Sequence, residues 1–92
     1  MIGRRLVVTR RVQVVFFRDW TVEQARALGL DGWVRNRADA SVEAVIAGAP
    51  EMVAAMIKRV RQGSPASRVD DVAVSEDVSG EVFHGFEKRP TR

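Results

Sequence analysis

The chain has 92 residues, of which 46% are hydrophobic and 29% charged, and its net charge at pH 7 is +3. This length allows one modest core, so we expect residues 1–92 to form a single domain. The absence of cysteine excludes disulfides and thiolate catalysis, and one histidine disfavours a histidine metal site or a Ser-His-Asp triad. No apolar run reaches the roughly 20 residues of a membrane helix, and charge interrupts the N-terminal segment too early for a signal peptide. We therefore expect a cytoplasmic protein without a membrane segment.

The first half of the chain predicts a strand, a helix and a hairpin. Residues 6–9 are β-prone and bounded by arginines, whereas residues 10–20 have no clear period and fit a strand that continues into a buried turn. Thr21 and Gln24 have the spacing of a capping box, and the apolar face that follows ends before Gly29, so we expect a helix over 21–28. Residues 33–37 and 42–47 read as paired strands around a polar turn at 38–40.

The second half predicts a helix followed by two strands. Pro50 suits a first helical turn, and Gly63 follows an apolar face with helical spacing: Val53, Met56, Ile57 and Val60. Residues 69–74 and the shorter run 82–87 read as strands. The resulting order predicts an α+β, ferredoxin-like βαββαβ sandwich, with an antiparallel sheet, two helices on one face and a short terminal strand.

Two polar residues lie where this fold could bind an anion. The segment between the first strand and the first helix can direct backbone N–H groups and a helix N-terminus at one point, and Arg18 lies just before the predicted helix. A guanidinium can hold two phosphate oxygens, although Arg18 could instead be a surface residue paired with Asp19 or Glu23. Asn36, near the end of the second predicted strand, is either a turn former or a residue that orients a water molecule.

Two longer motifs resemble the signatures of the acylphosphatase family. The family patterns G-R-V-Q-G-V-x-F-R and G-W-V-R-N-x-x-D-G-x-V-E are similar to Arg11-Val12-Gln13-x-Val15-Phe16-Phe17-Arg18 and to Gly32-Trp33-Val34-Arg35-Asn36-x-x-Asp39-x-Ser41-Val42-Glu43. Shorter matches between and after them extend the resemblance over nearly the whole chain. Two long motifs at the expected separation are a specific signal.

The resemblance implies metal-independent hydrolysis of the carboxyl-phosphate bond of acyl phosphates, giving a carboxylate and inorganic phosphate, by a monomer without a cofactor. Arg18 would neutralise the phosphoryl charge and Asn36 would hold the attacking water. The phosphate would be surrounded by the backbone of a loop made of Arg11, Val12, Gln13, Val14, Val15, Phe16 and Phe17. Catalysis of this kind depends on positioning and electrostatic stabilisation.

The chain departs from the family pattern at several positions. Arg10, Val14 and Ala40 stand where the signatures have glycine, and Lys88 stands at a position that is usually apolar. A β-branched residue is strongly disfavoured at positive φ, so Val14 would remodel the loop or crowd the phosphate. One alternative is therefore an acylphosphatase-like anion-binding domain with weakened or no catalysis. We expect Ala40 to affect stability more than chemistry.

A second alternative is a nucleic-acid-binding domain on a ferredoxin-like sheet. The basic charge permits it, but such domains need aromatic side chains together on one sheet face. Phe16 and Phe17 are adjacent and would point to opposite faces of a strand. We therefore expect a small acyl phosphate, and not nucleic acid, to be the partner.

Overall fold

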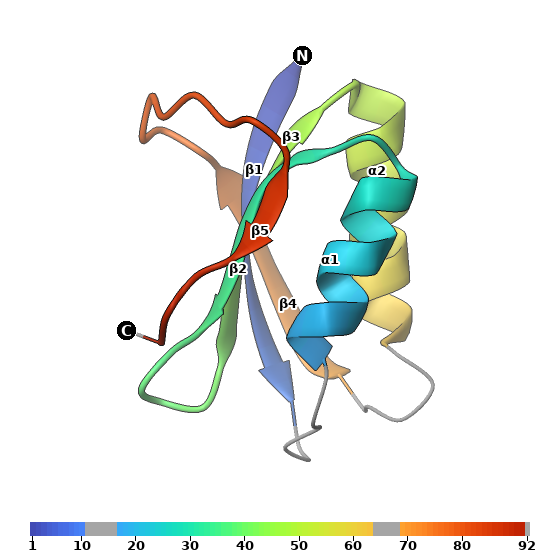
Figure 1. The fold of residues 1–92 in the computed structure, drawn as a ribbon. Helices are drawn as coiled ribbons and strands as arrows, with labels where there is room; N and C mark the ends of the chain where they lie inside the picture. Colours follow the sequence, from blue (N-terminus) through green and yellow to red (C-terminus); the bar gives the residue numbers. More distant parts are fainter. Residues whose placement is uncertain (11–16, 64–68, 92) are drawn as a thin grey trace.

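The computed structural model describes residues 1–10, 17–63 and 69–91. In chain order these residues form β1 (Ile2–Arg10), α1 (Phe17–Ala27), β2 (Asp31–Asn36), β3 (Val42–Gly48), α2 (Pro50–Gln62), β4 (Val69–Glu76) and β5 (Phe86–Lys88). The predicted order of elements, with its short terminal strand, is confirmed. Both helices cover the same face of the sheet (Figure 1), which leaves the other face without helices.

The strands form one sheet in the order β4-β1-β3-β2-β5. The predicted antiparallel pairing is correct for β1 with β3, β1 with β4 and β2 with β3. It is wrong for β5, which pairs in parallel with β2, so the sheet is mixed. The reason is the path of residues 77–85, which leave β4 at one edge and reach the opposite edge from the end where β2 begins (Figure 1). A strand entering from that end must run in the direction of β2.

The core lies between the sheet and the helices, as the sequence patterns predict. Alternate residues of the strands point into it, because successive side chains of a strand face opposite sides. The α2 face is confirmed, with Val53, Met56 and Val60 buried and Ile57 packed at the core edge. The fully buried set with the largest side chains comprises Phe17, Leu6, Ile46, Met56, Val8, Val34, Val42, Val53 and Val60.

Helix α1 begins at Phe17, so the prediction of a start at Thr21 is wrong. The Thr21 hydroxyl does not cap the helix; it donates a 2.9 Å hydrogen bond to the carbonyl oxygen of Phe17, one turn earlier. Phe17 is 2% exposed and its ring stacks on that of Trp20, with centroids 5.5 Å apart. Because Phe17 is buried and Trp20 packs against the core, the helix starts one turn before the predicted capping box. Arg18 therefore lies inside the first turn, not before the helix.

The β2–β3 hairpin turns where the sequence predicts. The amide of Arg37 donates to the carbonyl of Ser41 at 2.8 Å, and the Asp39 carboxylate accepts hydrogen bonds from the amide and hydroxyl of Ser41. These two hydrogen bonds lower the pKa of Asp39 from its ordinary value. Ala40 has a φ of 71°, which explains why the family pattern has glycine at this position.

Candidate active site

The C-terminal ends of β1 and β2 and the start of α1 lie at the same end of the molecule (Figure 1). Because β1 and β2 are both antiparallel to β3, they run in the same direction and finish together. Val42 of β3 is paired with Val8 on one side and with Asn36 on the other, so these three residues form one row across the sheet. The row lies on the helix-covered face, since Val8 and Val42 belong to the core.

The predicted loop residues Arg11, Val12, Gln13, Val14, Val15 and Phe16 lie outside the described residues. Their neighbours on both sides are described: Arg10 ends β1, and Phe17 begins α1. The loop therefore connects β1 to α1, whose adjoining ends lie at the same end of the molecule as the end of β2 that carries Asn36. Phe17, which the motif interpretation assigns to the loop, belongs to α1, and its side chain packs in the core and not at an open site.

Asn36 presents a buried acceptor that has no partner among the described residues. Its Oδ1 is inaccessible to solvent and receives no hydrogen bond from that part of the chain. A buried carbonyl without a hydrogen bond costs roughly 1–3 kcal/mol, so such groups are uncommon and often belong to functional sites. A water molecule or ligand would have to enter this enclosed space at the end of β2 to donate a hydrogen bond to Oδ1 of Asn36.

Arg18 lies in the first turn of α1 and is partly buried. The alternative pairing with Asp19 is not observed, because the Asp19 carboxylate is bound by Lys88 at 2.5 Å. Within the described residues, no carboxylate lies in ion-pair distance of the Arg18 guanidinium. The N–H groups in the first turn of a helix also project outward beyond its N-terminus and attract anions. The start of α1 thus combines a cation without an ion-pair partner in the described chain and a positive helix end.

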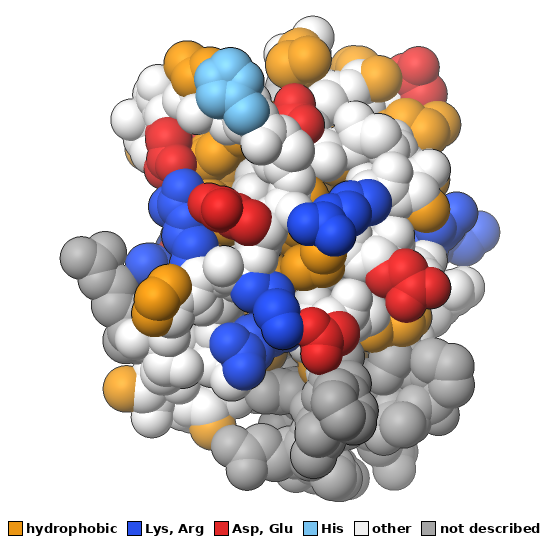
Figure 2. Space-filling model, in the orientation of Figure 1, with side chains coloured by type: hydrophobic (Ala, Val, Ile, Leu, Met, Phe, Trp, Pro, Cys, Tyr) orange, Lys and Arg blue, Asp and Glu red, His pale blue; other side chains and the backbone are white. Residues whose placement is uncertain are grey.

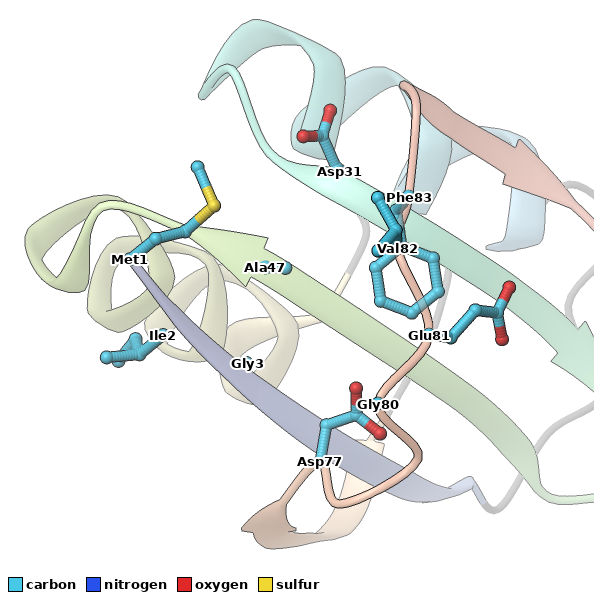
Figure 3. A pocket seen from close by; sticks show the side chains of 10 residues that line it. All are labelled: Met1, Ile2, Gly3, Asp31, Ala47, Asp77, Gly80, Glu81, Val82 and Phe83. Carbon is cyan, nitrogen blue, oxygen red and sulfur yellow. The ribbon is translucent and has the colours of Figure 1, made fainter.

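A pocket of about 370 Å³ lies at the opposite end of the sheet (Figure 3). It is bounded by Gly3, Ala47 and Asp31, near the beginning of β1 and β2 and the end of β3, and by the segment from Gly80 to Phe83. Its ten described lining residues include three carboxylates, and none of the ten is Lys, Arg or His. A phosphate dianion would be repelled there, so this pocket is not the predicted site.

The helix-free face carries an ion cluster that ties the site's strands together. Glu43 on β3 is 5% exposed and lies between Arg5 of β1 and Arg35 of β2. Arg5 Nε donates to Oε2 at 2.5 Å, and Arg35 Nε donates to Oε1 at 2.8 Å. Burial opposes the charged form of Glu43, but the hydrogen bonds from Arg35 and Arg5 outweigh it and lower the pKa of the carboxyl. Arg35 and Glu43 belong to the second motif, yet the sequence did not predict this role.

Among the described strand residues of the helix-free face, the ring of Trp33 offers little surface for stacking bases. Trp33 is 7% exposed, and the guanidinium carbons of Arg35 and Arg89 lie 4.6 and 5.0 Å from its ring centroid. On the side drawn in Figure 2, basic side chains alternate with acidic ones over the described surface and form no continuous stripe there. These observations disfavour the nucleic-acid alternative.

The described residues contain neither a metal-binding cluster nor a membrane-spanning helix. No group of three or more histidine or acidic side chains in ranges 1–10, 17–63 and 69–91 is arranged to hold a metal ion. Neither helix in this part of the structure is long and apolar enough to cross a membrane.

The fold is a ferredoxin-like α/β sandwich, and Arg18, Asn36 and the start of α1 lie at one end of its sheet. An acylphosphatase family model matches residues 4–88. A curated acylphosphatase of Rhizorhabdus wittichii is 62% identical over 90 residues, which cover 98% of this chain and 90% of the relative. The crystal structure of acylphosphatase from Bacillus subtilis has 37% identity and a TM-score of 0.89, covering 97% of this chain and 99% of that one. An acylphosphatase structure from Coxiella burnetii has 31% identity and a TM-score of 0.88, with coverage of 96% and 92%. The chain belongs to the acylphosphatase family.

Proposed function

We propose that this chain is an acylphosphatase that hydrolyses acyl phosphates without a metal ion or cofactor. A water molecule attacks phosphorus, the bond between phosphorus and the carboxyl oxygen breaks, and the products are a carboxylate and inorganic phosphate. The observation that carries the proposal is the Oδ1 of Asn36, which has no hydrogen-bond partner within the described part of the chain and lies at the end of the molecule where Arg18 and the α1 N-terminus also lie. Family membership supplies the reaction class.

Each group has a distinct part in the proposed reaction. Arg18 and the first-turn amides of α1 neutralise the phosphoryl oxygens, together with the amides of the 11–17 loop predicted from the motif. Asn36 Oδ1 accepts a hydrogen bond from the attacking water and holds it in line. An acyl phosphate has a good leaving group, so positioning and charge stabilisation suffice without a strong general base. The substrate phosphate itself accepts the proton released by the water.

Hydrolysis of benzoyl phosphate by purified variants tests this proposal. Arg18→Ala should lower kcat/KM by about 10³, and Arg18→Lys should restore part of it, because a lysine keeps the charge but not the bidentate geometry. Asn36→Ala should lower kcat by about 10²–10³ with KM little changed, since the amide acts on the water. Lys58→Ala, which removes an exposed cation from α2, is the control and should leave activity unchanged.

The alternative proposal is a weakened or inactive anion-binding domain, motivated by Val14 and Arg10 in place of signature glycines. A wild-type rate no higher than that of Arg18→Ala would support this alternative and overturn the hydrolase. We further propose that residues 1–92 act as one domain, as a monomer in the cytoplasm. The radius of gyration of 11.8 Å supports the single domain, because about 12 Å is expected for this length.

A further inference from the structure

The short strand β5 is in contact with both elements that carry the proposed site residues. It lies beside β2 (Figure 1) and contacts α1, with Lys88 in register with Val34, shortly before Asn36. Beyond the strand, the amide of Arg89 donates to the carbonyl of Val34 at 2.8 Å. On the helix side, Arg26 donates two hydrogen bonds, of 3.2 and 3.0 Å, to the carbonyl of Phe86. The strand that ends at Lys88 therefore has a defined position relative to α1 and β2.

Lys88 forms an ion pair with Asp19, the residue that follows Arg18. Its Nζ lies 2.5 Å from Asp19 Oδ1, and both side chains are about half exposed, at 48% and 50%. The groove between α1 and β5 also contains Glu23 and Glu87, so its negative charges outnumber its positive ones. Arg26 lines the same groove, but its guanidinium is directed to the Phe86 carbonyl. Lys88 is thus the cation that pairs with Asp19.

The negative charge of Asp19 affects how tightly an anionic substrate binds at the start of α1. An unpaired carboxylate in the first turn of α1 would repel a phosphate held at the same helix end and weaken the pull of Arg18. We propose that Lys88 is a positioning residue that acts through Asp19, neutralising this carboxylate so that the start of α1 binds phosphate more tightly. The proposal rests on the proposed function for the location of the phosphate. It also assigns a use to Lys88, which departs from the family pattern.

The test is the dissociation constant of inorganic phosphate, measured from amide shifts of the first turn of α1 in an NMR titration, so that binding is read without turnover. At low salt, Lys88→Met should weaken phosphate binding about three- to fivefold, as expected for one charge several ångströms away in a largely aqueous medium. Asp19→Asn should bind at least as well as wild type. Lys88→Met combined with Asp19→Asn removes both charges of the pair and should return to about the affinity of wild type.

Further variants distinguish charge from structure. Lys88→Arg should retain wild-type affinity, and Lys58→Met is the matched loss of an exposed lysine elsewhere. The effect of Lys88→Met should fade toward 1 M salt, where the Debye length falls to about 3 Å. Because a half-exposed pair contributes little to folding stability, all variants should fold. In turnover assays, the change should fall on KM for benzoyl phosphate and leave kcat within about twofold.

Two results would overturn the proposal. One is a double variant that binds phosphate as weakly as Lys88→Met, although it no longer carries the Asp19 charge, which would mean that Lys88 acts on phosphate directly. The other is a Lys88→Met protein that binds phosphate like Lys58→Met. If phosphate binding follows the expected pattern but the wild-type chain does not hydrolyse benzoyl phosphate, the proposed function fails while the role of Lys88 stands.

Discussion

Ala40 has a conformation that its side chain disfavours. Its φ of 71° lies in the left-handed region, and no other non-glycine residue in the described chain has a positive φ. Its Cβ crowds the following carbonyl there, at a cost of roughly 1–2 kcal/mol. The hairpin keeps this strain because the hydrogen bonds of Arg37, Asp39 and Ser41 close the turn around it.

We expect Ala40→Gly to stabilise the protein by about 0.5–1 kcal/mol. The relief of strain exceeds the added chain entropy of glycine in the unfolded state, which is about 0.4–1 kcal/mol. Urea unfolding at pH 7 measures the difference. Ala38→Gly is a matched control in the same turn, and it should be neutral or destabilising because Ala38 has no positive φ to relieve. Equal effects of both variants would contradict the prediction.

At the scale of elements, the Glu43 cluster joins three strands on the face that no helix covers. Glu43→Gln should destabilise the protein by about 2–3 kcal/mol, because it leaves two arginines without their carboxylate. The loss is smaller than for a fully buried pair because the Arg5 side chain is 39% exposed and its charge is partly screened by solvent. Glu76→Gln, at an exposed position of the edge strand β4, should change stability by less than about 0.5 kcal/mol. Chemical denaturation compares the two variants.

Elements with a local signal could be predicted from the sequence, whereas contacts between distant residues could not. The α2 face follows from the spacing of Val53, Met56 and Val60 within one segment. The start of α1 was missed because the capping-box pattern at Thr21 is local, whereas the burial of Phe17 depends on the rest of the core. The parallel pairing of β5 has no local signature, because it depends on where β2 lies in the folded sheet.

In the candidate site, too, features with a local motif could be predicted from the sequence, whereas contacts between distant residues could not. The motifs placed Arg18 and Asn36 at one end of the fold, and the topology brings the elements that carry them together there. Their roles stay predictions. The pairing of Asp19 with Lys88 joins opposite ends of the sequence, so no motif within either segment could reveal it.

At the scale of the whole molecule, we expect stability to decline in acid. The folded-state pKa of Glu43 lies below its ordinary value of 4.5, so its contribution is fully present above pH 4.5 and is lost as the pH falls through the folded pKa. The free energy of unfolding should therefore decrease steadily below about pH 5. Glu43→Gln lacks this titration, so its acid limb should be flatter and the gap to wild type should narrow. Parallel curves for the two proteins, measured by urea unfolding at a series of pH values, would contradict this.

The order of strands also determines when the sheet can form during synthesis. β1 is made first, yet it lies between β3 and β4, and Arg4 is paired with Glu76, most of the chain away. β1 is the first strand to leave the ribosome, but both of its edges can be paired only after β4 has also been made. Pairings that distant give a high contact order, and such domains fold in milliseconds to seconds, not microseconds. The nascent chain consequently exposes one unpaired edge of β1 until β4 has been made, and chaperone binding during that interval would protect it.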